Sequence, residues 1–155
     1  MNRLQAGDKA PLFTLLDQNG HEVSLAELLK DQQVLVYFYP KALTPGCTVQ
    51  AENLRDQKDA LAQLNTIAVG ISPDAVKKLK NFEDKKELNF TLLSDEDHAI
   101  ADAFGVWGPK KFMGKEYDGI HRISFLIGQD GLVKHVFDKF KTKDHHQVVI
   151  DFLSA

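Results

Sequence analysis

The chain has 155 residues and a formal net charge of −3, with 43% apolar and 26% charged residues. This length suits one domain with a buried core, and no basic excess indicates binding to nucleic acid or to a membrane surface. No apolar run approaches the ~20 residues of a membrane-spanning helix, and the first residues lack a signal peptide's apolar stretch. We therefore expect a single domain over residues 1–155, located in the cytoplasm.

The cysteine content restricts the chemistry. Cys47 is the only cysteine of the chain, which excludes an internal disulfide, a thiolate zinc cage and a C-x-x-C redox pair. A lone cysteine is usually a small buried apolar residue. The residues around Cys47 therefore have to show whether it is a buried apolar residue or a reactive thiol.

The first elements alternate strand and helix patterns. Apolar runs on either side of Asn19-Gly20 predict a β-hairpin, and Ser24 is suited to cap a short helix after it. Residues 33–39 are nearly all β-branched, aromatic or aliphatic and predict a buried central strand. Over residues 47–64 apolar side chains recur at helical spacing, which predicts one amphipathic helix.

The middle of the chain repeats this alternation. Residues 66–72 predict a second buried strand, whose last residue caps a helix with Pro73 in its first turn. Residues 90–93 predict a short third strand. Ser94 or Asp95 is suited to cap the next helix.

Residues 105–119 are expected to form a long loop. Its large apolar side chains suit a substrate mouth, a dimer contact or a satellite hydrophobic cluster. These side chains are Trp107, Phe112, Met113 and Tyr117.

The C-terminal part predicts an antiparallel strand pair and a closing helix. The strands are expected at residues 120–127 and 132–137, and the helix at residues 144–153. His145 and His146 stand together near the start of this helix. Adjacent helical residues point in different directions, so a capping or surface role is favoured over a metal site.

The order of elements defines the fold class. An N-terminal hairpin, then alternating strands and helices, then a β-β-α unit predict an α/β fold with a mixed central sheet and helices on both faces. A β-α-β half followed by a β-β-α half is the thioredoxin-like arrangement.

The segment before Cys47 carries the chemical signal. A buried strand ends at Pro40, a turn containing Pro45 and Gly46 follows, and a helix begins at Cys47. Unpaired N–H groups at a helix start favour a thiolate over a thiol, and the carboxyl end of a central strand is where α/β sheets bind ligands. The Thr44 hydroxyl is suited to reach the sulfur or to serve the turn, and Pro40 either ends the strand or also walls the site.

Arg122 is the candidate partner of that thiolate. It opens an apolar strand, where an unpaired charge is costly, and a Cys47 thiolate would relieve that cost. The alternative is a surface arginine at a strand end. Gln50, one helical turn after Cys47, is suited to be a solvated helix residue. His121 is expected on the opposite face of the sheet.

The Pro-x-x-x-Thr-x-x-Cys pattern formed by Pro40, Thr44 and Cys47 resembles the active-site motif of peroxiredoxins. Residues 37–48 are similar to the bacterioferritin comigratory protein subgroup, also called the Q type. The resemblance spans nearly the whole chain. It includes residues 6–11, 92–95, 104–107 and 122–127.

This resemblance implies a thioredoxin-like fold and a thiol-dependent peroxidase for antioxidant defence. The Cys47 thiolate would attack hydrogen peroxide or an organic hydroperoxide and become a sulfenic acid. Thr44, Arg122 and helix N–H groups would stabilise the developing charge, with Pro40 shaping the site and Gln50 orienting Arg122. No metal or organic cofactor is implied.

One departure from the subgroup bears on the cycle. Many members carry a resolving cysteine five residues after the nucleophile, where this chain has Glu52, or in the helix spanned here by residues 74–86, which has none. We therefore expect a one-Cys cycle in which an external thiol, thioredoxin or glutaredoxin with glutathione, reduces the sulfenic acid. The chain is expected to be a monomer or a weak homodimer.

Two other readings use the same fold. A thiol-disulfide oxidoreductase is disfavoured because Thr44 stands where such motifs have the first of two cysteines, and because no proline precedes Arg122. A peroxide sensor or chaperone-like module would keep Cys47 reactive but show little turnover with any reductant.

Overall fold

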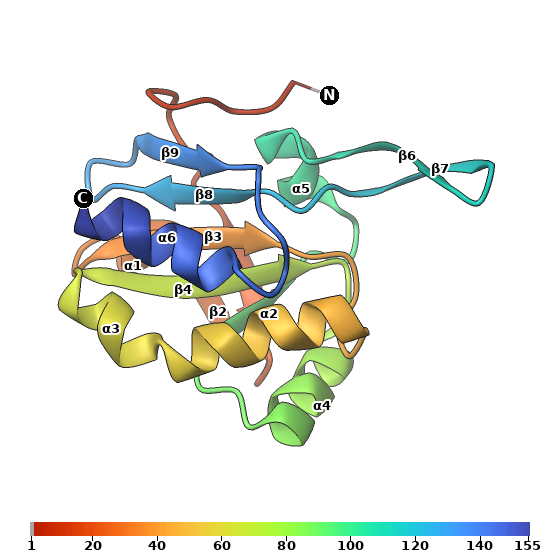
Figure 1. The fold of residues 1–155 in the computed structure, drawn as a ribbon, viewed down its shortest axis with the longest axis horizontal. Helices are drawn as coiled ribbons and strands as arrows, with labels where there is room; N and C mark the ends of the chain where they lie inside the picture. The colour runs from red at the N-terminus through yellow and green to blue at the C-terminus, as the bar shows by residue number, and fades with distance from the viewer. Residues whose placement is uncertain (1) are drawn as a thin grey trace.

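The computed structural model of the protein describes residues 2–155, in which helices and strands alternate (Figure 1). No helix within this part of the chain is long and apolar enough to cross a membrane. The elements in chain order are β1 (Thr14–Asp17), β2 (Glu22–Ser24), α1 (Leu25–Leu28), β3 (Gln33–Phe38), α2 (Pro45–Asp56), α3 (Lys58–Gln63), β4 (Thr66–Ser72), α4 (Val76–Lys86), β5 (Thr91–Ser94), α5 (Ala99–Phe104), β6 (Trp107–Phe112), β7 (Lys115–Ile120), β8 (Ser124–Ile127), β9 (Val133–Phe137) and α6 (His145–Ser154).

The main sheet has the strand order β2-β1-β5-β4-β3-β8-β9. Strand β3 runs parallel to β4 and antiparallel to β8, and β1 and β2 form the N-terminal hairpin. The predicted α/β fold with a mixed sheet is confirmed. Strands β3, β4, β8 and β9, together with α2 and α6, form the thioredoxin-like arrangement.

Strand β3 explains why helices cover both faces of the sheet. Val34, Val36 and Phe38 pack into a core with residues of α1 and α5, whereas Leu35 and Tyr37 pack into a second core with residues of α2, α4 and α6. Successive side chains of a strand point to opposite faces. A strand that is apolar from Val34 to Phe38 therefore requires a helical layer on each side (Figure 1).

The expected loop at residues 105–119 is wrong. Strands β6 and β7 pair with each other as a separate antiparallel hairpin, which projects from the body of the molecule (Figure 1). The strand expected at 120–127 starts only at Ser124. Residues 111–118 are all exposed, so neither face of this hairpin shows the apolar alternation that marks a half-buried strand.

Three helix predictions also need correction. The helix expected over 47–64 is two helices, α2 and α3, separated at Gln57. Helix α4 begins at Val76, after Pro73, with Ala75 as its N-cap. His145 is fully buried rather than exposed, with its Nε2 atom 2.7 Å from Ser124 Oγ, because its ring packs against Tyr37 and Phe140.

One predicted helix cap is confirmed, and the second acts from further along the chain, because the N-cap residue of α5 is His98 rather than Ser94 or Asp95. The Ser24 hydroxyl accepts a hydrogen bond from the Glu27 N–H at the start of α1. The Asp95 carboxylate accepts from the N–H groups of Ile100 (3.1 Å) and Ala101 (2.9 Å) at the start of α5. Burial raises the pKa of Asp95, while these two hydrogen bonds lower it.

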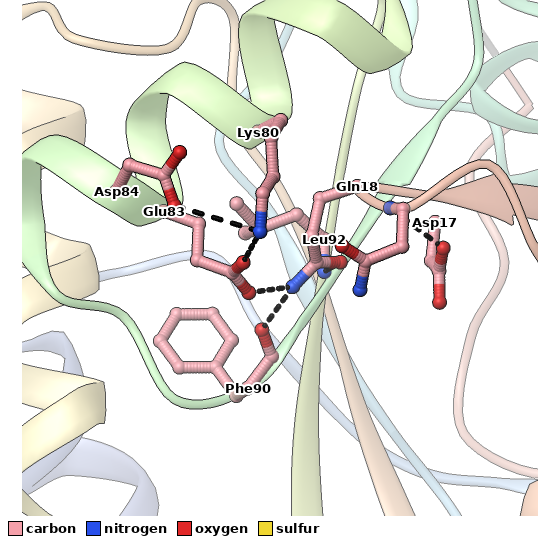
Figure 2. A network of polar contacts seen from close by, with 8 residues as sticks. Asp17, Gln18, Lys80, Glu83, Asp84, Phe90 and Leu92 are labelled. Carbon is pink, nitrogen blue, oxygen red and sulfur yellow. Dashed lines mark hydrogen bonds and ion pairs between the residues drawn. The ribbon is translucent and has the colours of Figure 1, made fainter.

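Hydrogen bonds of a buried glutamine connect the N-terminal hairpin to the rest of the sheet. Gln18 donates to Glu83 and to the carbonyl of Phe90, and accepts from the N–H of Leu92 (Figure 2). Lys80 in turn pairs with Glu83 and with Asp84. This network joins the turn after β1 to α4 and β5.

Candidate active site

Cys47 lies in the first turn of α2, directly beyond the carboxyl end of β3. Thr44 is the N-cap residue in extended conformation, and Pro45 begins the helix. The first helical hydrogen bond runs from the Thr48 N–H to the Thr44 carbonyl (2.9 Å). The N–H groups of Gly46 and Cys47 therefore precede the helical ladder, and their partial positive charge favours an anion at this helix start.

The loop before α2 is held in a strained conformation by a buried carboxylate. Leu43 has a φ of +66°, a left-handed conformation that costs a residue other than glycine roughly 1–2 kcal/mol. The neighbouring Ala42 N–H donates to Asp74 Oδ2 (2.7 Å), and the Ser72 hydroxyl donates to the same oxygen (2.8 Å). Asp74 thus anchors the loop to the end of β4.

Arg122 joins Cys47 and Gln50. Its Nη2 atom lies 3.2 Å from Cys47 Sγ, and its Nη1 atom donates to Gln50 Oε1 at 3.2 Å. Cys47 and Gln50 are each only 1% exposed. The guanidinium is planar, so contacts of one nitrogen with the sulfur and of another with a buried amide oxygen together fix its orientation.

Two backbone features bring Arg122 to this position. The Phe38 N–H donates to the Ile123 carbonyl (3.2 Å), so the pairing between β3 and the chain entering β8 extends almost to Arg122. A Cβ atom at Gly46 would lie 3.3 Å from Arg122 Nη2 and 3.5 Å from Thr142 Cγ2. Glycine at position 46 therefore allows the guanidinium to approach the helix start closely.

Two tyrosines form the inner wall of this region. Tyr37 and Tyr39 are each 1% exposed, and their rings stack with centroids 5.4 Å apart. Burial raises the pKa of both hydroxyls, and the neighbouring Cys47 raises it further. Both side chains are therefore neutral, so neither hydroxyl competes as an anion for the positive charge of Arg122.

The other two predicted site residues contribute through the loop. The Thr44 hydroxyl donates to the Lys41 carbonyl (2.8 Å), so in this structure it serves the turn rather than the sulfur. Pro40 is half-buried at the end of β3 and limits the strand. His121 contacts the carbonyl of Pro109 through Nε2, which places its ring against β6.

Sequence reasoning missed Asp74, Gly46 and the buried His145. Asp74 had a detectable signal, because a polar residue directly beyond the carboxyl end of a buried strand lies at the edge where α/β proteins build sites. His145 lies behind the site between Tyr37 and Phe140. Burial and the nearby His146 and Arg122 lower its pKa to about 3, whereas Asp144 raises it, so the ring is neutral near neutral pH.

Comparison with known proteins identifies the family. Residues 6–136 match the model of the AhpC/TSA family. The chain is 63% identical over 155 residues to a putative peroxiredoxin Bcp of Haemophilus influenzae, covering 100% of this chain and 99% of the relative. It is 60% identical over 153 residues to peroxiredoxin Bcp of Escherichia coli K12, covering 99% and 97%.

Solved structures agree with this assignment. Peroxidoxin BcpB from Mycobacterium tuberculosis superimposes with a TM-score of 0.87 at 34% identity, covering 98% of this chain and 97% of that chain. The bacterioferritin comigratory protein of Xanthomonas campestris gives 0.86 at 30% identity, covering 95% and 98%. The chain belongs to the AhpC/TSA family and is a peroxiredoxin of the bacterioferritin comigratory protein, or Q, type, which makes it a thiol peroxidase.

The cysteine content separates this chain from one of its structural relatives. Xanthomonas campestris peroxiredoxin Q has been solved with either of two different cysteines replaced by serine. This chain has Cys47 alone. Glu52, which stands at the position where many members of the subgroup carry a resolving cysteine, pairs with Arg55 at 3.9 Å on the surface of α2.

Proposed function

We propose that Cys47 is the peroxide-reducing nucleophile and that Arg122, oriented by Gln50, stabilises both its thiolate and the transition state. The contact between Arg122 Nη2 and Cys47 Sγ at 3.2 Å carries this proposal. A guanidinium held this close to the sulfur is a fixed donor suited to the negative charge that develops there during the reaction. Asp74, Thr44 and Pro40 hold the loop that sets the start of α2.

The proposed reaction needs only the chain and a hydroperoxide. The thiolate attacks the terminal oxygen, the S–O bond forms as the O–O bond breaks, and the other oxygen leaves as water or alcohol after taking up a proton. Negative charge spreads over the sulfur and both oxygens. Arg122 and the N–H groups of Gly46 and Cys47 are donors suited to that charge.

The sulfenic acid formed on Cys47 is then reduced from outside the chain. An external thiol attacks the sulfur, an S–S bond replaces the S–O bond, and water leaves. A second thiol releases Cys47 from this mixed disulfide. We place this one-Cys cycle in the cytoplasm, where small and protein thiols are available as reductants. The chain acts in it as a single domain and as a monomer or weak homodimer.

Treatment with one equivalent of hydrogen peroxide tests the proposal. The intact mass is expected to increase by one oxygen, a sulfenic-acid trap is expected to label Cys47, and no disulfide is expected. Cys47→Ser is the control and should take up no oxygen. An unreactive thiol would exclude the nucleophile role, and oxidation with no turnover by any thiol would favour the peroxide sensor.

A further inference from the structure

The β6–β7 hairpin exposes apolar side chains that do not pack against the body of the molecule. Phe112 is 66% exposed, Met113 is 86% exposed and Tyr117 is 47% exposed. Met113 occupies the turn, with a φ of +53°. A cluster of exposed large apolar side chains on a projecting element usually marks a site that binds another molecule.

The register of the hairpin sorts its charges onto two faces. Phe112 pairs with Lys115, and Lys110 pairs with Tyr117, so these four side chains share one face. We name this the aromatic-basic face. The opposite face carries the acidic residues Glu116 and Asp118, and Lys111 pairs with Glu116 there at 3.7 Å. The aromatic-basic face therefore has two lysines and no carboxylate.

The aromatic-basic face leads to the Cys47 site. A Cβ atom at Gly119 would lie 3.2 Å from the Tyr117 ring and 3.3 Å from Lys110 Cδ, so both side chains lie over this glycine. Lys110 Nζ donates to the Ile120 carbonyl (2.7 Å), two residues before Arg122. Burial and the nearby Arg122 lower the pKa of Lys110, whereas the nearby Cys47 raises it.

The size of the patch indicates a transient partner. With about 200 Å² for each full side chain, the exposed parts of Phe112, Met113 and Tyr117 amount to roughly 400 Å². A stable interface takes about 800 Å² from each partner, whereas redox encounters are smaller. Two copies of this face would also bring lysines against lysines, which disfavours self-association through it.

We infer that the aromatic-basic face is the docking surface for a protein dithiol reductant with an apolar, acidic rim around its reactive thiol. This inference rests on the proposed function, since the partner is the thiol that reduces the Cys47 sulfenic acid. Cys47 is only 1% exposed, so the attacking thiol has to be delivered to it. In Figure 1 the hairpin projects on the same side of the molecule as the start of α2.

The reaction on this surface balances within the two partners. One thiolate of the dithiol attacks Cys47 Sγ, an S–S bond forms, the S–O bond breaks, and the oxygen leaves as water. The second thiol then attacks the partner's own sulfur in the mixed disulfide. The partner ends as a disulfide, having given two electrons, and Cys47 returns as a thiolate.

The test separates docking from chemistry by using two kinds of reductant. Turnover with hydrogen peroxide is measured with thioredoxin or glutaredoxin and their recycling enzymes, and separately with dithiothreitol. The variant Phe112→Ser/Met113→Ser/Tyr117→Ser should raise the KM for the protein reductant about 10-fold or more. Oxidation of Cys47 and turnover with dithiothreitol should stay within about twofold, since neither depends on a docked protein. Leu12→Ser, which alters a side chain 67% exposed outside the hairpin, is the control.

A charge-reversal pair sharpens the test. Lys115→Glu on the aromatic-basic face should raise the KM for the protein reductant about fivefold more than Lys111→Glu on the opposite face, and salt should reduce this difference. Three results would overturn the inference: an unchanged KM in the triple variant, an equal loss with dithiothreitol, or a wild-type protein that no protein dithiol reduces. If peroxide fails to oxidise wild-type Cys47, the proposed function itself is wrong, and that step is measured without any reductant.

Discussion

Gln18 and Gln50 are two buried glutamines, 5% and 1% exposed, but they use their amide groups differently. Gln18 engages both ends of its amide: Oε1 accepts from Leu92, and Nε2 donates to Glu83 and Phe90 (Figure 2). Gln50 accepts from Arg122 through Oε1, while its Nε2 has no partner among the described residues.

This difference separates a structural network from a candidate catalytic one. A fully bonded buried amide stabilises the fold and leaves nothing for a ligand. An unpaired buried N–H costs about 1–3 kcal/mol, so it persists where another requirement maintains it, here the orientation of Arg122. Gln18 also lines a cavity of about 460 Å³. Its amide is already bonded to the protein at both ends, so it offers a ligand in that cavity no free polar group.

The largest effect is expected at Arg122. Arg122→Met should slow the oxidation of Cys47 by about 10²–10³-fold, because it removes a fixed donor from the transition state. The free energy of unfolding should fall by only about 1–2 kcal/mol, because Gln50 Oε1 loses its donor. The measurement is the second-order rate constant with hydrogen peroxide, together with urea unfolding. Arg122→Lys should fall in between, because an ammonium lacks the planar fork that contacts Sγ and Gln50 together. Equal rates in all three proteins would show that the sulfur needs no cation.

Gln18→Ala should lower the stability of the fold and leave the rate of Cys47 oxidation unchanged, the opposite of the result expected for Arg122→Met. The substitution leaves the Leu92 N–H and the Phe90 carbonyl without their partner, and the free energy of unfolding should fall by about 2–4 kcal/mol. The rate constant for Cys47 oxidation should not change. Gln147→Ala, which removes an exposed amide bonded to Asp151, is the matched control and should cost about 0.5 kcal/mol or less. A slower oxidation in Gln18→Ala would mean that the two networks are coupled.

His145 tests whether every incompletely bonded polar group is catalytic. Its Nε2 bonds to Ser124, and its Nδ1 has no partner in the described part of the chain. Its pKa is lowered to about 3 from 6.5, so below about pH 6.5 the unfolded chain binds a proton that the folded chain does not. This contribution to stability is complete above about pH 6.5 and decreases by about 1.4 kcal/mol per pH unit as pH falls towards the folded pKa.

The comparison that isolates this effect is between the wild type and His145→Phe. The variant should lose that part of the pH dependence of the free energy of unfolding, which amounts to about 2 kcal/mol between about pH 6.5 and pH 5. Cys47 oxidation at neutral pH should be unchanged, because His145 contacts Ser124, Tyr37 and Phe140 rather than the sulfur. The same slope in both proteins would mean that His145 titrates normally.

The sequence predicted the parts of the fold that bury apolar residues. The central strands, the N-terminal hairpin and the Asp95 cap follow from local patterns, because burial on both faces or a cap leaves a composition that can be read in a short window. The β6–β7 hairpin left no such trace, since its outer part is exposed on both faces. The break between α2 and α3 at Gln57 was equally unmarked.

The candidate site divides in the same way. Cys47 and Arg122 were found from residue type and position, and the structure brings them together. The position of Asp74 just beyond β4 marks the edge of the sheet, but its role could not be predicted, because its partner is a backbone N–H 32 residues away, at Ala42. His145 was misjudged because its burial depends on tertiary packing against Tyr37 and Phe140.

Gln50→Leu is the smallest expected change and the most direct test of the comparison. Leucine is similar in size and removes the unpaired Nε2 from the core, so the free energy of unfolding should stay the same or rise by up to about 1 kcal/mol. Arg122 loses the acceptor for Nη1, and Cys47 oxidation should slow by about 10-fold, through a guanidinium that is still present but less fixed in direction. Gln50→Glu separates orientation from charge, because a carboxylate would hold Arg122 in place while competing with the thiolate for its positive charge. We expect Gln50→Glu to be slow as well, because Arg122 would then share its positive charge between the carboxylate and the sulfur. If Gln50→Leu instead loses stability and keeps its rate, Gln50 serves the fold as Gln18 does, and the unpaired amide has no catalytic meaning.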